Sequence, residues 1–65
     1  MNKLNDYDVV RLNHAIVQHN LPEGAIGTIV MIYSEPLAYE VEFCDDEGGT
    51  IALLTLHEEE ISRVN

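Results

Sequence analysis

Three histidines and one cysteine are the side chains of this sequence best suited to hold a metal ion: His14, His19, His57 and Cys44. Structural zinc sites usually take paired ligands from one short stretch of chain, as in Cys-x-x-Cys. No such pair is present, because the two nearest candidates, His14 and His19, are separated by four residues and the cysteine stands alone. We therefore expect solvated imidazoles and a thiol at the end of a strand, with no metal site and no cofactor.

An acidic run over Asp45, Asp46 and Glu47 is the other candidate for binding a cation. A calcium loop of the EF-hand type spaces its ligands at alternate positions and ends on a distal bidentate glutamate. The run has neither feature. It predicts weak, adventitious calcium binding at most.

Catalytic chemistry is limited to a carboxylate pair and the single thiol. Glu40 and Glu42 are expected on one solvated strand face, whereas acid and base roles need two different environments. Negative charges next to Cys44 disfavour its thiolate form, and a very small barrel fills its interior with its own side chains. We expect the protein not to be an enzyme.

The composition predicts a single globular domain over residues 1–65, with 46% apolar and 23% charged residues. Twelve acidic and three basic residues leave a formal net charge of −9, which repels nucleic-acid phosphates. One cysteine cannot form an internal disulfide, so a reducing cytoplasm is expected. No signal-peptide pattern or membrane-length apolar run is present, and a chain that starts at Met1 is expected to be a complete small gene product.

Period-two alternation dominates the sequence and predicts β-structure. The expected strands cover residues 7–12, 27–34, 38–44, 50–55 and 61–64. A bulge or bend is expected near Gly27, and the clearest alternation, in 38–44, places Val41 and Phe43 inward and the glutamates outward. Residues 13–24 are expected to form a long loop with at most one helical turn, 45–49 a hairpin loop, and 57–60 a 3-10 turn.

These elements predict an all-β fold, a small SH3-like antiparallel barrel of about five strands with one long early loop and a 3-10 turn before the last strand. Closing the sheet into a barrel would pair its edges and surround one core. The expected core residues are Val10, Leu12, Ile29, Ile32, Val41, Phe43, Leu54, Leu56 and Ile61.

Three segments carry a resemblance to a known family: GAIGTIV over 24–30, YEVEF over 39–43 and GTIA over 49–52. From Leu4 to about Val64 the sequence resembles a family of small bacterial proteins that is classed only as a domain of unknown function. The resemblance implies an SH3-like barrel and a bacterial source. It also implies a gene next to that of a second small protein, an arrangement that suggests a toxin paired with an antitoxin or immunity protein.

The glycine-bearing turn is similar, more weakly, to the KOW segments of translation-associated SH3-like barrels. Those segments use basic loop residues on RNA. Here the loops carry Glu23, Asp45, Asp46 and Glu47 instead, so RNA binding is not expected.

More apolar residues are present than one small core needs. If Ile29 and Ile32 point inward across a bulge, Val30 and Met31 are left partly outside. The strand at 50–55 similarly leaves Ile51 and Leu53 pointing outward. Such a patch is typical of an interface, unless the long loop with Ile16, Val17 and Leu21 covers it.

The leading hypothesis is a non-enzymatic module that binds a basic protein, the product of an adjacent gene, as an antitoxin or immunity-type inhibitor. The residues expected to contact this partner are Val30, Met31, Glu40, Glu42, Asp45, Asp46, Glu47, Ile51 and Leu53. Two alternatives are a self-associating structural barrel, which would form a homo-oligomer, and an acidic mimic of nucleic acid. The acidic residues, including those of 58–60, could also serve solubility alone.

Overall fold

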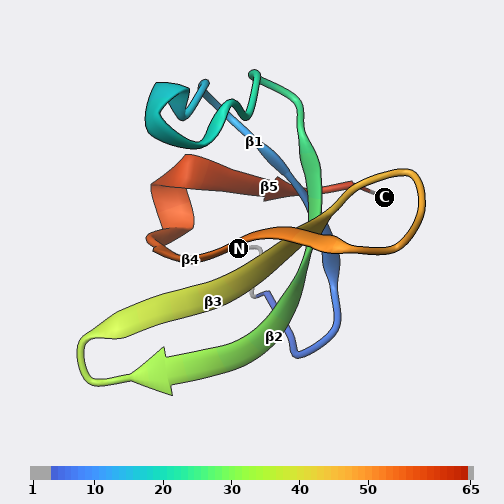
Figure 1. The fold of residues 1–65 in the computed structure, drawn as a ribbon. Helices are drawn as coiled ribbons and strands as arrows, with labels where there is room; N and C mark the ends of the chain where they lie inside the picture. Colours follow the sequence, from blue (N-terminus) through green and yellow to red (C-terminus); the bar gives the residue numbers. More distant parts are fainter. Residues whose placement is uncertain (1–3, 65) are drawn as a thin grey trace.

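The computed structural model describes residues 4–64 and places them in one antiparallel sheet (Figure 1). Its strands are β1 (Val9–Leu12), β2 (Ile26–Ser34), β3 (Leu37–Cys44), β4 (Thr50–Leu56) and β5 (Ile61–Arg63). The chain also forms two 3-10 turns. The first, η1 (Val17–His19), lies in the long loop between β1 and β2, and the second, η2 (Glu58–Glu60), directly precedes β5. The predicted all-β class, the five strands and the 3-10 turn before β5 are confirmed.

The strands follow the order β4-β3-β2-β1-β5, so β4 and β5 are the two edges of the sheet. The sheet curls around one core, but within residues 4–64 these edges are not paired with each other. The expected closure into a barrel is therefore not observed, and the SH3-like arrangement is an open, curled sheet. The short β5 pairs only with β1, from Val10↔Arg63 to Leu12↔Ile61, and η2 occupies the chain between β4 and β5.

The first strand begins two residues later than predicted. Tyr7 has a φ of 68°, which places it in the left-handed region of a turn, and it is exposed rather than part of a pleated strand. Its N–H nevertheless donates to the carbonyl of Ile29 at 2.7 Å, which holds the turn against β2. The other strand ends differ from the prediction by one residue or not at all.

Two bulges bend the sheet. Ile29 pairs with Val41 and Met31 with Glu40, so Val30 is the extra residue of the first bulge. The second lies in β4, where the pairing shifts between Phe43 and Cys44 and leaves Ile51 as the extra residue. A bulge increases local twist and bend. A bulge or bend in β2 was expected near Gly27, and the bulge lies three residues further along the strand, at Val30.

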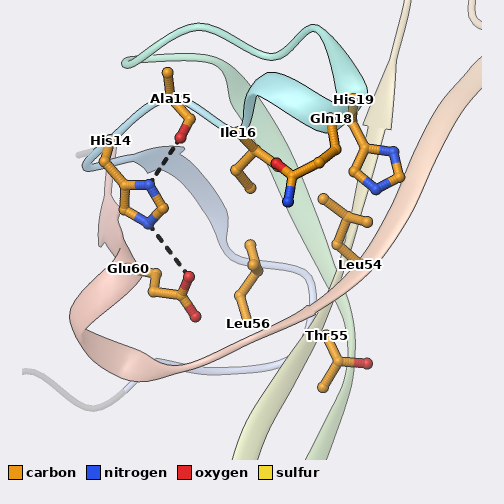
Figure 2. A pocket seen from close by; sticks show the side chains of 9 residues that line it. All are labelled: His14, Ala15, Ile16, Gln18, His19, Leu54, Thr55, Leu56 and Glu60. Atoms are coloured by element: carbon orange, nitrogen blue, oxygen red, sulfur yellow. Dashed lines mark hydrogen bonds and ion pairs between the residues drawn. The ribbon is translucent and has the colours of Figure 1, made fainter.

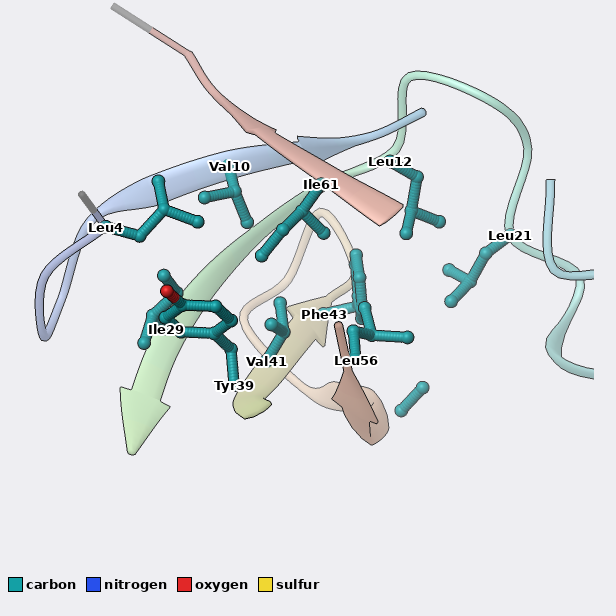
Figure 3. Close-up of a cluster of buried hydrophobic side chains, with 11 residues drawn as sticks. Leu4, Val10, Leu12, Leu21, Ile29, Tyr39, Val41, Phe43, Leu56 and Ile61 are labelled. Carbon is teal, nitrogen blue, oxygen red and sulfur yellow. The ribbon is translucent and has the colours of Figure 1, made fainter. Parts of the chain in front are cut away.

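The inner face of the curled sheet carries the core (Figure 3). Its largest fully buried side chains are Phe43, Leu12, Ile29, Val10 and Val41. Seven of the nine expected core residues are buried. The two exceptions, Ile32 and Leu54, are only half-buried and pack against the core from its rim, because one lies towards the β2–β3 turn and the other on the edge strand β4.

Candidate interaction surface

The outer face of the sheet, opposite the core, is continuous across four strands. The strand pairing places Val9 opposite Thr28, Thr28 opposite Glu42, and Glu42 opposite Leu53. Neighbouring strands lie about 4.8 Å apart, so this row of side chains spans about 14 Å. Met31 and Thr55 lie on either side of Glu40 in a second row.

Large apolar side chains on and beside these rows meet solvent. Met31 is 51% exposed and Leu53 is 53% exposed, although both belong to regular strand positions. Ile51, at the second bulge, is exposed to a similar degree. We name the exposed apolar residues and the two glutamates between them the outer patch, which consists of Val9, Ile26, Met31, Glu40, Glu42, Ile51 and Leu53.

The two carboxylates of the outer patch are held by neutral hydroxyl groups. Thr55 Oγ1 donates to Glu40 Oε1 at 2.7 Å and the Tyr33 hydroxyl donates to the same oxygen at 3.3 Å. The Thr50 hydroxyl donates to Glu42. Electrostatic repulsion from the Glu40 carboxylate, followed by desolvation, raises the pKa of the Tyr33 phenol.

No basic side chain of residues 4–64 forms an ion pair with either carboxylate of the outer patch. The ion pairs among these residues are Arg63–Asp8 and His14–Glu60, both away from Glu40 and Glu42. The patch therefore presents negative charges that are not neutralised within the described chain, each with one exposed apolar side chain as a cross-strand neighbour.

Five of the predicted contact residues are brought together in the outer patch: Met31, Glu40, Glu42 and Leu53 are neighbours across β2, β3 and β4, and Ile51 follows at the bulge. Val30 is only half-exposed. The loop residues lie at the end of the β3–β4 hairpin, and Asp45 Oδ1 accepts the N–H groups of Glu47 and Gly49, both at 2.9 Å. The Asp45 carboxylate thus shapes its own loop, whereas Asp46 and Glu47 are exposed.

The long loop does not cover the outer patch. Leu21 from this loop is buried in the core and Ile16 packs against it, while Val17 is exposed. The alternative in which the loop hides the surplus apolar residues is therefore not observed for Met31, Ile51 or Leu53.

Two apolar members of the outer patch, Val9 and Ile26, were not among the predicted contact residues. The alternation in the first strand could have identified Val9, because it places this side chain on the other face of the strand from the buried Val10 and Leu12. Ile26, which is exposed, was missed because β2 begins one residue before the predicted start. Tyr33 could not be foreseen, since its contact with Glu40 depends on the strand register.

A second feature is a groove of about 300 Å³ between the long loop and β4 (Figure 2). It is lined by His14, Ala15, Ile16, Gln18, His19, Leu54, Thr55, Leu56 and Glu60. His14 is exposed, as expected, but its ring also makes two contacts that were not predicted: its Nε2 lies 3.2 Å from Glu60 Oε1 and its Nδ1 lies 2.9 Å from the Ala15 carbonyl oxygen.

Both partners of the His14 ring are acceptors, so the ring satisfies both contacts only when each nitrogen carries a proton. The Ala15 carbonyl and then the Glu60 carboxylate raise the pKa of His14 for this reason. Since neither nitrogen has a free lone pair in this arrangement, the geometry does not suit a general base. The pair instead ties the long loop to η2.

This tie predicts a pH-dependent contact. The pKa of His14 is raised on folding. The contribution of the His14–Glu60 contact to the free energy of unfolding is therefore fully present below the ordinary histidine pKa near 6.5, and it is lost as the pH rises through the raised pKa. We expect Glu60→Gln to lower the titration midpoint of His14 in an NMR titration of the imidazole protons. Glu59→Gln, an exposed neighbour in η2, is the matched control, and equal midpoints in the two variants would contradict the assignment.

Residues 4–64 contain no cluster of three or more His, Cys, Asp or Glu side chains placed to hold a metal ion. None of the helical segments in this part of the chain is long and apolar enough to cross a membrane.

The fold and the outer patch define a small all-β domain with an open, curled sheet and an exposed acidic and apolar face. The chain belongs to the family described as Domain of unknown function (DUF4926), whose model matches residues 6–63. The predicted membership of a small family of this kind is confirmed. No curated protein and no solved structure matches the chain.

Proposed function

We propose that this protein is a non-enzymatic interaction module that uses its outer patch to bind a basic partner protein in the cytoplasm. The observation that carries the proposal is the pair Glu40 and Glu42, whose charges have no basic partner among residues 4–64 and are flanked by exposed Met31 and Leu53. A buried apolar centre with charges that match those of the partner is typical of specific protein interfaces.

The charge of the whole chain supports a basic partner. A net charge of −9 on 65 residues attracts a positively charged protein over several ångströms and repels acidic ones. Electrostatic attraction of this kind raises the association rate, while the apolar members of the outer patch slow dissociation. An antitoxin or immunity-type inhibitor that covers a basic site on the product of an adjacent gene fits this combination.

Co-expression tests the proposal directly. We expect the tagged protein, produced together with the products of its adjacent genes, to retain one basic product through affinity purification and gel filtration. A complex held by the outer patch should form more slowly at high salt, because salt screens the electrostatic attraction between the two proteins. Recovery of the tagged protein alone from every such pair would contradict the proposal.

Self-association is the alternative that one observation favours, since the exposed apolar members of the outer patch could also pair across a two-fold axis. Two copies would, however, bring Glu40 and Glu42 of each chain towards those of the other. We therefore favour the basic partner, and the exchange experiment described below separates the two.

A further inference from the structure

The edge strand β4 offers a backbone surface as well as side chains. It has seven residues, compared with three in β5, the other edge of the sheet. Natural proteins usually protect a long edge with charged residues, proline or a covering segment. The residues of β4, TIALLTL, include neither a charge nor a proline.

The pairing of the sheet shows which peptide groups of β4 have no partner strand within residues 4–64. The backbone groups of Ile29 face the β1 side, because its N–H donates to the Asp8 carbonyl at 3.0 Å. In an antiparallel sheet, alternate residues direct their peptide groups to opposite sides. The opposing residue Val41 therefore directs its groups to β4, where it pairs with Leu54.

Because Leu54 bonds towards β3, the peptide groups of Leu53 and Thr55 point away from the sheet. Within residues 4–64, neither residue forms a backbone hydrogen bond on that side outside the strand ladder. Both residues are exposed, so a segment from another chain can reach their N–H and C=O groups.

The groove described above runs beside this free edge. Leu54 and Leu56 on β4 and Ile16 on the long loop supply its apolar walls (Figure 2). On the outer face of the sheet, Leu53 of β4 is paired with Glu42 of β3. A strand added to β4 would therefore alternate between the groove, which Leu54 and Leu56 help to line, and the outer face, which carries Glu42.

We propose that the partner inserts an extended segment that pairs with the free edge of β4 and alternates basic and apolar residues. This inference rests on the proposed function and specifies how the partner is recognised. The basic side chains would lie on the outer face about 10 Å, or two strand spacings, from the backbone of Glu42, within the range of its charge. The apolar side chains would enter the groove over Leu54 and Leu56.

The charge distribution favours this occupant over a second copy of the chain. Pairing β4 with its own copy would place the Glu42 residues of both chains on the same face of one sheet, and each chain carries a net charge of −9. A strand with basic side chains on the outer face would instead be attracted by the Glu42 carboxylate.

Amide hydrogen exchange followed by NMR tests the inference with a defined probe. The probe is a short peptide that alternates Lys and Val and is blocked at both ends; the control has the same composition with all lysines first. We expect the alternating peptide to slow exchange at Leu53 and Thr55 by about tenfold or more, because their N–H groups gain acceptors, with a smaller change at Leu54. Slowing by the block-ordered peptide to the same degree, or no slowing by either, would overturn edge pairing.

Proline substitution supplies a second, independent readout. Thr55→Pro removes an N–H on the free side without removing a bond to β3, so we expect a folded protein that binds the alternating peptide at least about tenfold more weakly. Thr55→Val keeps the N–H and is the matched control. If Thr55→Pro binds as well as Thr55→Val, edge pairing is excluded.

Two further outcomes separate this inference from the function on which it rests. If exchange at Leu53 and Thr55 is already slow without peptide and depends on protein concentration, a second copy occupies the edge and the inference fails. If the co-expressed partner binds without protecting these amides, edge pairing fails while the proposed function stands.

Discussion

Replacing Gly27 by alanine is expected to lower the free energy of unfolding by about 2–3 kcal/mol. A Cβ at this position would lie 2.7 Å from Val41 Cγ1 and 2.9 Å from two ring carbons of Phe43. Both of these side chains are fully buried and fixed by the surrounding core, so neither can move aside without cost. Urea denaturation measures this loss of unfolding free energy, and we expect the slope of the free energy against urea concentration to be unchanged.

The contact with the ring can be isolated by a double-mutant cycle. In a Phe43→Leu background the ring is absent, so we expect Gly27→Ala to cost less there than in the parent chain. Gly48→Ala is a useful comparison, because Gly48 has a φ of 87° but open space around it, and its substitution costs backbone strain alone. An equal cost of Gly27→Ala in both backgrounds would show that crowding by Phe43 is not the reason for the glycine.

Local alternation in the sequence predicts the strands of this fold and their faces, but it does not explain Gly27. The alternation in 38–44 is sufficient to predict β3 and its buried face, because a strand with one face in the core must alternate. The same logic identifies the exposed position of Leu53. The glycine was interpreted as a bend in the strand, whereas the structure shows that it provides space for the Phe43 ring, which belongs to another strand.

Features that depend on how distant segments meet were not predictable in this way. His14 and Glu60 are 46 residues apart, and their contact exists only because the long loop passes close to η2. The lack of pairing between β4 and β5 within residues 4–64 likewise depends on the short β5 and the path of the chain through η2. Local patterns predict strands and their faces, but they do not show whether the last strand reaches the edge that would close the barrel.

The outer patch depends both on local sequence pattern and on how distant segments of the chain meet. Its glutamates were predicted from alternation alone, but their lack of basic partners depends on where the few cations lie in the fold. Arg63 is paired with Asp8 at 3.2 Å, and His14 is held by Glu60. These two basic groups are thus engaged elsewhere, and Arg11, which lies opposite Ile26 in the sheet, forms no ion pair with Glu40 or Glu42, so within residues 4–64 neither glutamate has a basic partner.

Reversing these two charges should weaken binding of the co-expressed partner by about 100-fold or more. In the Glu40→Lys, Glu42→Lys double variant, two attractive contacts with a basic surface become repulsive in the middle of the outer patch. Isothermal titration calorimetry at fixed salt would measure the change. The free energy of unfolding should fall only modestly, because the two substitutions remove acceptors of the Thr55, Tyr33 and Thr50 hydroxyls but break no ion pair in the described part of the chain.

Two controls separate the position of the charges from their number. Glu23→Lys with Glu35→Lys changes the net charge of the chain by the same amount, but both residues lie in exposed turns outside the outer patch. We expect this variant to slow association moderately and to leave dissociation nearly unchanged. Glu40→Gln with Glu42→Gln keeps acceptors for the Thr55 and Thr50 hydroxyls and should fall between the parent and the reversed variant. If the two lysine variants weaken binding equally, overall charge determines the affinity and the outer patch is not the binding surface.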